Sequence, residues 1–417
     1  ARRAPDWRKN RSMHSLSCRP FAAARVRRTF GAALLLTLLS AITPAATLLV
    51  GPQAPALSLA EALKTAQDGD TVALLPGQYK GQTGVISQRQ LTLRAVSERP
   101  VLLFEGRVAE RKAMLVVRGG DVTIENIEFR GARADDANGA GIRHESGKLT
   151  VRNCLFLDNE NGILTGNDAN AELVVEDSEF GLAPRIVGGL HHLLYVGRIG
   201  RFSIRGSRFY SGHEGHLIKS RARESRITYN LIYDGDEGQA SYEIDLPNGG
   251  LAWVIGNIIG QGARSQNPVM VAYGGEGSAW PKNGLYVSHN SFVGNPWPPS
   301  WFLRVFEDRL PAGIEVKAIN NIALGLGLFS PGTDGEFRGN VWGMRRRALQ
   351  SIYTLDFSLT EASGWRGTAQ PAGQGGGESL QPTAEFVLPH GTRPLQPPAA
   401  WSPGAMQTRL GPRATVP

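Results

Sequence analysis

The stretch VTIENIEF, residues 122–129, sets the pattern on which the fold depends. Its apolar residues alternate on both sides of a polar position, which predicts a short strand, a corner and a second short strand. The pattern recurs along the chain as LTVRNCLF (149–156), LVVEDSEF (173–180), FSIRGSRF (202–209), RITYNLIY (226–233), AWVIGNII (252–259), LYVSHNSF (285–292), VKAINNIA (316–323) and GEFRGNVW (335–342).

The corner position is mostly Asn, Asp or Gly, and it recurs at intervals that suit one coil of a solenoid. Its successive members are Asn126, Asn153, Asp177, Gly206, Asn230, Asn257, Asn290, Asn321 and Asn340. Asn tolerates the left-handed backbone of such a corner, and stacked Asn amides can bond one another in a ladder. One unit cannot bury its own apolar face, so the units must stack. No Trp-Asp signature or leucine consensus recurs, which disfavours a propeller or a leucine-rich repeat. We therefore expect an all-β, single-stranded right-handed parallel β-helix.

The ends of the solenoid carry their own signals. Ser58 and Glu61 have the spacing of a capping box, which predicts a helix through Gln67 that caps the core. We place the β-helix at residues 47–366 and a Pro/Gly-rich tail at 367–417. The glycine-rich run 367–379 resembles a flexible linker, and the rest of the tail either packs along the outside of the coils or is disordered.

The first 46 residues predict an export signal. They combine a basic segment, the apolar run FGAALLLTLLSAI (30–42) and the small residues TPAA (43–46). Nine of the 45 Lys and Arg and one of the 37 acidic residues lie there, so the leader accounts for the whole net charge of +8. The remaining chain is balanced, which argues against nucleic-acid binding. We expect a periplasmic or secreted monomer, with an uncleaved membrane anchor as the alternative.

Polar residues gather in three successive coils. They are His191, His192, Tyr195, His213, Glu214, His216, Lys219, Arg221, Arg223, Tyr242, Glu243 and Asp245. Aligning HLLYVG (192–197) with HLIKSR (216–221) pairs His192 with His216 and Tyr195 with Lys219. Because side chains alternate along a strand, this register predicts an outward stripe on adjacent strands. A solvent-exposed salt-bridge ladder is the structural alternative.

The same alternation, applied to the next strand, YEID (242–245), predicts that Tyr242 and Ile244 face inward. Glu243 and Asp245 would then face outward, and Glu243 would pair with Lys219.

The segment GHEGHLIKSRARESRITYNLIYDG (212–235) resembles the chondroitinase B and alginate lyase family of polysaccharide lyases. The resemblance implies a parallel β-helix that cleaves uronic-acid polysaccharides, with a lysine as base and calcium at the sugar carboxylate. Lys219 matches that lysine, and Glu214 matches one acidic calcium position. The second acidic position is Gly212 here. The family's arginine position falls in the acidic stretch 242–245, so Arg198, Arg221 or Arg223 would have to supply that cation.

Two residues compete for the role of base. β-Elimination needs a base and a stabilised carboxylate, and a lysine beside Arg221 loses its proton more easily. If Glu243 pairs with Lys219, Tyr195 becomes the better base, with His192 or His216 as its partner.

Aromatic residues in the longer loops suggest a surface for sugar rings. YGGEGSAWPKNG (273–284) and NPWPPSWF (295–302) carry Tyr273, Trp280, Trp297 and Trp301, with packed loops as the alternative. We expect catalytic roles for Lys219, Tyr195, His192, His216, Arg221 and Glu243, and substrate contacts from Arg223, His213, Asp245, Tyr242, Tyr273, Trp280 and Trp297.

The sequence thus predicts a lyase that acts on an acidic polysaccharide. No cofactor is certain, and calcium at Glu214 is the one candidate. A non-catalytic glycan-binding or exopolysaccharide assembly protein is the alternative from another class. A uronate epimerase and an inverting hydrolase, which needs two carboxylates, stay open on the same fold.

Overall fold

The computed structural model divides the chain into residues 1–44 and 45–417, and it describes residues 45–53, 55–186, 190–294, 297–344 and 346–408. Residues 1–44 of the predicted export signal, including Cys18, lie outside the described residues. None of the helices within them combines the length and apolar character that a transmembrane helix requires.

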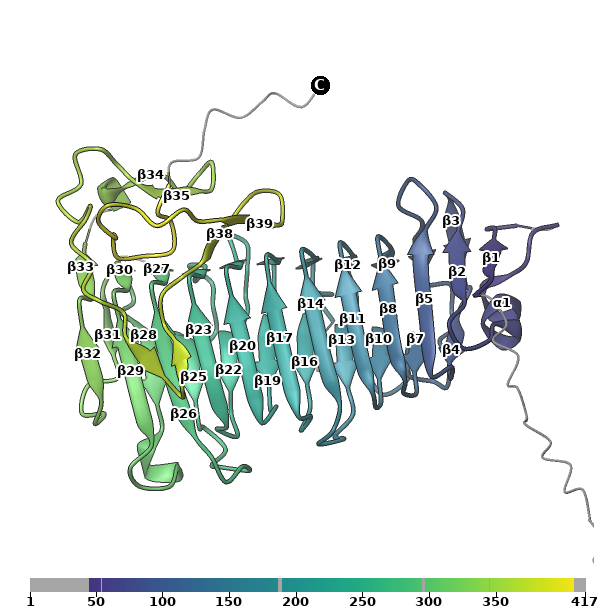
Figure 1. Ribbon diagram of the computed structural model, residues 1–417, viewed down its shortest axis with the longest axis horizontal. Helices are drawn as coiled ribbons and strands as arrows, with labels where there is room; N and C mark the ends of the chain where they lie inside the picture. Colours follow the sequence, from purple (N-terminus) through teal and green to yellow (C-terminus); the bar gives the residue numbers. More distant parts are fainter. Residues whose placement is uncertain (1–44, 54, 187–189, 295–296, 345, 409–417) are drawn as a thin grey trace, which may run out of the picture. The chain divides into compact units, whose positions relative to one another are not determined.

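Three parallel sheets form the wall of a right-handed solenoid, which confirms the predicted fold. Each complete coil contributes one strand to sheet A, then one to sheet B and one to sheet C, and Figure 1 shows the strands of successive coils side by side. Sheet A consists of β1 (Thr47–Val50), β2 (Thr71–Leu74), β5 (Gln90–Ala95), β8 (Asp121–Glu125), β11 (Lys148–Arg152), β14 (Glu172–Glu176), β17 (Arg201–Arg205), β20 (Glu224–Thr228), β23 (Leu251–Ile255), β26 (Gly284–Ser288), β29 (Glu315–Ile319) and β32 (Glu336–Arg338).

Sheets B and C complete the wall. Sheet B consists of β3 (Gln78–Lys80), β6 (Val101–Leu103), β9 (Glu128–Arg130), β12 (Leu155–Leu157), β15 (Glu179–Gly181), β18 (Arg208–Tyr210), β21 (Leu231–Tyr233), β24 (Ile258–Gly260), β27 (Ser291–Val293), β30 (Ile322–Leu324) and β33 (Val341–Gly343). Sheet C consists of β4 (Gly84–Ile86), β7 (Ala113–Val117), β10 (Ala140–His144), β13 (Asn161–Thr165), β16 (Leu194–Val196), β19 (Ile218–Ser220), β22 (Tyr242–Leu246), β25 (Val269–Tyr273), β28 (Ser300–Val305) and β31 (Gly327–Phe329).

The core consists of the inward rows of these strands. Phe129, Phe156, Phe180 and Phe209 stack along the axis with ring centroids 4.7–5.0 Å apart. Each ring is fully or almost fully buried, and burying one stabilises the fold by about 2 kcal/mol. Cys154, the one thiol among the described residues, is buried too.

Two neighbouring columns form the corner between sheets A and B, and the predicted corner residues are split between them. Left-handed backbone occurs at Asn126, Asn153, Asp177 and Gly206, but then at Tyr229, Gly256, His289, Asn320 and Gly339. The predicted equivalence of Gly206 with Asn230 is therefore wrong by one residue, because Arg205 pairs with Thr228.

The second column is an internal hydrogen-bond ladder. The side-chain oxygens of Asn230, Asn257, Asn290, Asn321 and Asn340 each accept from the backbone N–H of the ladder residue one coil earlier, at 2.9–3.0 Å. Ser178 and Ser207 continue the ladder toward the N-terminus with hydroxyl acceptors. The predicted Asn ladder thus exists, and it satisfies backbone donors that the corner would otherwise bury.

A helix closes the N-terminal end. In α1 (Leu59–Thr65), Ser58 and Glu61 form the predicted capping box. Leu59 and Leu63 are buried in the core, so the helix covers its first coil. The helix ends at Thr65, two residues before the predicted limit.

The C-terminal segment packs on the outer faces of sheets A and B. Its elements are η2 (Arg346–Ala348), β34 (Leu349–Ser351), β35 (Asp356–Leu359), β36 (Gln374–Gly375), β37 (Glu378–Ser379), β38 (Ala384–Phe386) and β39 (Thr392–Pro394); η1 (Glu307–Arg309) lies earlier, after β28. Phe357 and Phe386 pack on Leu231 and Ile322 of sheet B. The expected linker, residues 367–379, contains the β36–β37 hairpin, and the Gly375 carbonyl accepts from Trp253 Nε1 on sheet A at 3.0 Å.

Candidate active site

The outer face of sheet C carries a row of residues in register across successive strands. The row contains Val116, Arg143, Leu164, Tyr195, Lys219, Asp245, Ala272 and Arg304. The predicted pairing of Tyr195 with Lys219 is confirmed. Stacked parallel strands lie about 4.8 Å apart, so Tyr195, Lys219 and Asp245 are within mutual reach.

Alternation breaks at the start of these strands, which overturns the prediction for Glu243. Leu217 and Ile218 both face the core, and Ile218 pairs with Ile244 one coil later, which Glu243 directly precedes. Glu243 is therefore fully buried, with Gln261 Nε2 at 3.3 Å from Oε2. Burial, and secondarily Asp234, raises the pKa of Glu243 well above its usual range. It does not pair with Lys219.

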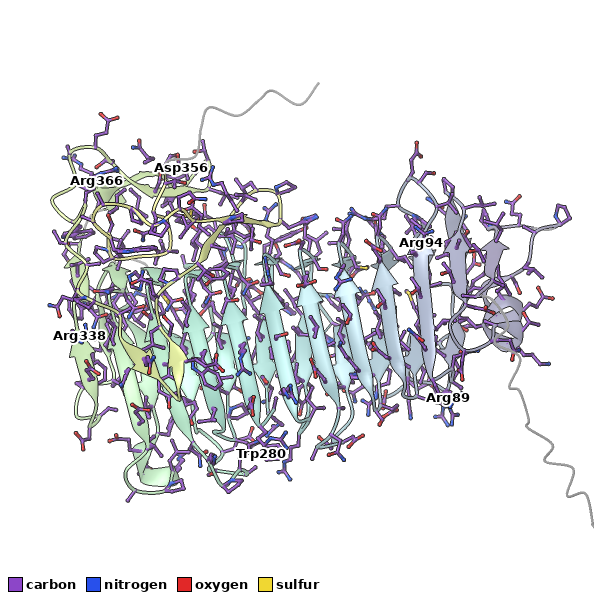
Figure 2. The ribbon with its side chains drawn as sticks, in the orientation of Figure 1. Arg89, Arg94, Trp280, Arg338, Asp356 and Arg366 are labelled. Atoms are coloured by element: carbon purple, nitrogen blue, oxygen red, sulfur yellow. The ribbon has the colours of Figure 1, made fainter. Side chains whose placement is uncertain are left out.

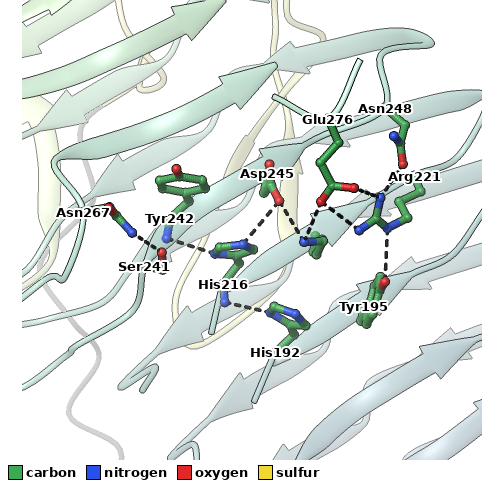
Figure 3. A network of polar contacts seen from close by, with 11 residues as sticks. His192, Tyr195, His216, Arg221, Ser241, Tyr242, Asp245, Asn248, Asn267 and Glu276 are labelled. Atoms are coloured by element: carbon green, nitrogen blue, oxygen red, sulfur yellow. Dashed lines mark hydrogen bonds and ion pairs between the residues drawn. The ribbon is translucent and has the colours of Figure 1, made fainter. Parts of the chain in front are cut away.

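Asp245 takes the place predicted for Glu243. Its Oδ2 lies 3.3 Å from Lys219 Nζ and 3.3 Å from His216 Nε2, and the residue is only 4% exposed. Figure 3 shows the Asp245 carboxylate joined to the His216 imidazole by a dashed line. Ile244 faces inward and Asp245 outward as predicted, whereas Tyr242 lies outside against His216.

His192, His216 and Tyr242 form an aromatic stack beside the charged row. The rings of His192 and His216 are 4.9 Å apart, and those of His216 and Tyr242 are 4.8 Å apart. His192 Nδ1 accepts the His216 N–H at 2.9 Å, and His216 Nδ1 accepts the Tyr242 N–H at 3.2 Å. Each neutral ring must therefore carry its proton on Nε2, which lets His216 donate to Asp245.

The stack also holds Tyr195 in place. The His192 ring meets the Tyr195 ring edge-on at 5.0 Å. Burial, with the nearby charges of Lys219 and Arg221 adding to it, lowers the pKa of His192 well below its usual value. His192 is thus a neutral support behind Tyr195 near pH 7.

Arg221 joins the row to a loop more than fifty residues later. Its Nε donates to the Tyr195 hydroxyl oxygen at 3.1 Å, and its Nη2 donates to Glu276 Oε1 at 2.9 Å. Nη1 bonds Asn248 and the other oxygen of Glu276. Lys219 Nζ lies 3.5 Å from Glu276 Oε1, so two cations converge on one carboxylate (Figure 3). The Arg221 guanidinium holds the pKa of Glu276 below its ordinary value.

The aromatic residues predicted to bind sugar have different surroundings. Tyr273 is fully buried in the core, where its hydroxyl donates to the Gly250 carbonyl at 2.6 Å, so its predicted sugar contact is wrong. Trp280 donates from Nε1 to the Arg221 carbonyl at 3.0 Å, with Arg223 over its ring, and Figure 2 shows it at the edge of the coils. Trp297 is 75% exposed.

His213 and Glu214 lie in the turn before β19. His213 Nδ1 is 2.9 Å from Gln239 Oε1, and its Nε2 is 3.9 Å from Glu214. Among the described residues, no hydrogen bond or ion pair joins Glu214 to Lys219 or Arg221. No group of three or more His, Cys, Asp or Glu side chains in that part of the chain could share a metal ion.

Calcium does not fit the charged cluster either. Asp245 faces Lys219 and His216, and Glu276 faces Lys219 and Arg221. A divalent cation between these carboxylates would meet an ammonium and a guanidinium, whereas calcium sites are built from uncompensated oxygen ligands.

A cavity of about 350 Å³ opens beside Tyr195 on the coils that precede it. It is lined by Arg111, Lys112, Asp136, Asn138, Arg143, Leu164, Thr165, Asn167, Tyr195 and Gly197. The sequence analysis missed these cations, although Arg143 stands in the same outward row as Tyr195. The register of the stretch RH (143–144) with the later strands could have identified Arg143, but no cluster of histidines or lysines pointed to this stretch.

Comparison with known proteins supports the fold. No protein-family model matches the chain, and no curated protein matches it in sequence. The crystal structure of pectate lyase Pel9A superposes with a TM-score of 0.59 and 13% identity, covering 88% of this chain and 97% of that one. A mutant of AlyGC, an alginate lyase of the PL6 family, gives a TM-score of 0.33 and 15% identity over 82% of this chain and 59% of that one, a superposition too loose to support an argument. At 13% identity the likeness to the pectate lyase shows a shared fold.

Proposed function

We propose that the protein cleaves an acidic polysaccharide by β-elimination at the outer face of sheet C. The observation that supports this proposal best is the convergence of Lys219 and Arg221 on one carboxylate, beside the Tyr195 hydroxyl. A uronate carboxylate can take the place that Glu276 occupies. The fold shared with a pectate lyase agrees with this substrate class.

The reaction needs a base and a stabilised carboxylate. The proton leaves C5 of the uronate, the bond from C4 to the glycosidic oxygen breaks, and a C4–C5 double bond forms. The leaving oxygen gains one proton, so no net proton is consumed. Lys219 and Arg221 would hold the carboxylate, on which negative charge grows when the C5 proton departs.

Between the two candidate bases, the contacts favour Tyr195. Lys219 Nζ already lies 3.3 Å from Asp245 Oδ2 and 3.5 Å from Glu276 Oε1, so two carboxylates engage it. The Tyr195 hydroxyl oxygen accepts from Arg221 Nε at 3.1 Å, and a charged donor there would stabilise the negative charge that a base carries after losing its proton to solvent. We therefore assign Tyr195 as the base and Lys219 as a carboxylate ligand and proton donor to the leaving oxygen.

A non-catalytic glycan-binding protein is the second candidate. It is favoured by the ion pairs of Lys219 and Arg221 with Asp245 and Glu276, because side chains held in such pairs would bind an anionic sugar without acting as a base. An epimerase would share the first step and return the proton to C5. The hydrolase alternative is weaker because one of its carboxylates, Glu243, lies behind the sheet.

Location and partners belong to the proposal as well. The apolar run at residues 30–42 supports a periplasmic or secreted protein. The charge balance of the chain after residue 46 supports a polysaccharide rather than a nucleic acid as the partner, and we propose that the protein works as a monomer.

The test is an ultraviolet assay of the full chain for the unsaturated product. Polygalacturonate, alginate, chondroitin, heparin and bacterial exopolysaccharides serve as substrates, each with calcium and with a chelator. Tyr195→Phe should lower turnover by about 10²–10⁴-fold while substrate binding persists. Tyr353→Phe, at an exposed tyrosine of the C-terminal segment, is the matched control and should leave turnover unchanged.

Two other results carry different conclusions. Binding without an absorbance change, and without proton exchange at C5 by nuclear magnetic resonance, would replace the lyase with the glycan-binding protein. Full turnover by Tyr195→Phe, together with its loss in Lys219→Gln, would reassign the base to Lys219.

A further inference from the structure

We propose that the cavity beside Tyr195 is a subsite for a negatively charged sugar unit, with Lys112 and Arg143 as its anion ligands. This inference deepens the proposed function and rests on it. It adds a direction: the anionic unit binds on the N-terminal side of Tyr195, over β7, β10 and β13.

The position of the cavity follows from the register of sheet C. Arg143 pairs with Leu164, and Leu164 pairs with Tyr195. Arg143 therefore stands in the outward row two strands before the proposed base, about 10 Å away. Tyr195 itself lines the cavity, so a sugar bound there is continuous with the reacting unit. The volume, about 350 Å³, suits a small ligand of the size of a sugar unit.

Three cations and one carboxylate, Asp136, line the cavity. Glu145 pairs with two of the cations, with Oε1 at 2.7 Å from Lys112 Nζ and 3.2 Å from Arg143 Nε, and Arg111 lies 3.7 Å from the exposed Asp135. Arg143 Nη2 donates to Glu145 Oε2 at 3.3 Å, but its buried Nε makes no aligned hydrogen bond. Lys112 and Arg143 thus share one carboxylate, and an anion bound in the cavity would give them a second acceptor.

The C-terminal side of Tyr195 has a different character. The charges of Lys219 and Arg221 are matched there by Asp245 and Glu276. Beyond Asp245 the row continues with Ala272 and then Arg304, whose guanidinium lies over the rings of Trp301 and Phe306. The neighbouring outward row presents Tyr242, Val269 and Trp301, which are in register. This side offers mainly apolar and aromatic surface to a sugar face, with one cation, Arg304, three strands beyond Lys219.

Binding of size-defined oligosaccharides to the full chain, measured by calorimetry, tests the inference without requiring turnover. The probes are an oligogalacturonate, a sulfated oligosaccharide and a neutral oligosaccharide of equal length. Arg143→Gln and Lys112→Gln should each weaken binding of an anionic probe about tenfold and leave the neutral probe within twofold. Arg94→Gln, an exposed arginine of β5 on sheet A (Figure 2), is the charge-matched control and should change nothing.

The outcomes separate the inference from the function on which it rests. If wild-type protein binds no anionic probe, both fail. If it binds one and both variants bind it equally well, the subsite is wrong and the proposed function stands. An equal loss for the neutral probe would also overturn the subsite, because charge would not be the cause. A loss confined to the galacturonate or to the sulfated probe supports the subsite and names its anion. Lys112 is more exposed than Arg143, so Lys112→Gln remains informative if Arg143→Gln does not fold.

Discussion

Glu276 occupies the position in which we place the substrate carboxylate, so Glu276→Gln should improve binding of an acidic polysaccharide. In the resting structure its carboxylate bonds Arg221 through both oxygens and lies 3.5 Å from Lys219. The substrate has to displace these contacts. Glutamine keeps the shape of the side chain and removes the charge, so less interaction is lost when the substrate enters.

The size of the effect follows from exposure. The Glu276 side chain is 48% exposed, so solvent screens the pair and its strength lies near the upper end of exposed ion pairs, about 1 kcal/mol. The ion pair lies at the upper end of this range because Arg221 is only 16% exposed and bonds both oxygens of Glu276. Removing about 1 kcal/mol of competition should lower the KM or Kd about fivefold at low salt. The same change should lower the free energy of unfolding by less than about 1 kcal/mol.

The assay compares initial rates and binding at low and high salt for wild type, Glu276→Gln and Glu237→Gln. Glu237 forms an exposed pair with Arg264 at 2.7 Å, away from the row, and serves as the control. The fivefold gain should shrink at high salt because screening already weakens the competing pair. A higher KM, or lost turnover in Glu276→Gln, would refute the reasoning and make Glu276 a participant rather than a competitor.

Three further predictions concern stability, each measured by urea unfolding. Asp245→Asn should lower the free energy of unfolding by about 2 kcal/mol, because Lys219 loses its buried counter-charge. A loss below about 0.5 kcal/mol, the range of ordinary surface substitutions, would contradict that burial. Asn257→Ala should lower the free energy of unfolding by about 3 kcal/mol, because two donors of Asn230 lose their acceptor inside the corner. A loss below about 1 kcal/mol would mean that water replaces the amide. Burial lowers the pKa of His289 to about 4, so on acidification the unfolded chain binds the proton before the folded chain does. The free energy of unfolding present above about pH 6.5 should therefore fall toward pH 4 by about 1.4 kcal/mol per pH unit. His289→Gln should flatten this part of the profile, and an unchanged slope would exclude His289 as its source.

The repeat made the fold predictable, because every coil repeats the same burial problem. Strands, corners and the capping box followed from local spacing, as did the pairing of Tyr195 with Lys219. The error at the corner arose where the Asn residues pass from the left-handed column to the neighbouring ladder column. Asn230 and Gly206 look equivalent in the sequence, yet the left-handed position had moved to Tyr229.

The charged partners could not be predicted in the same way. Strict alternation fails where Leu217 and Ile218 both enter the core, and this failure sends Glu243 inside and leaves Asp245 beside Lys219. The contact of Arg221 with Glu276 depends on how a long loop folds back across the coils, and no periodic signal encodes it.

Tyr273 is a residue that the sequence places in a loop and the structure places in the core. It opens the run YGGEGSAWPKNG (273–284), which the sequence predicts as a loop, but it is the last residue of β25 and belongs to the core. Register on the strand, rather than the composition of the adjoining loop, decided where its side chain lies.

The C-terminal segment constrains the number of coils in the solenoid. It contacts residues of widely separated coils: Gln370 bonds Asn320, Gly391 bonds Gly206, and His390 Nε2 lies 3.1 Å from Asn153 Oδ1. Inserting or deleting one coil between residues 153 and 320 would displace these anchor points by about 4.8 Å, one strand spacing. A plain repeat array can gain or lose units without penalty to its neighbours. Here the tail makes coil number a fixed dimension, so lineages can vary the length of this solenoid only by altering the tail as well.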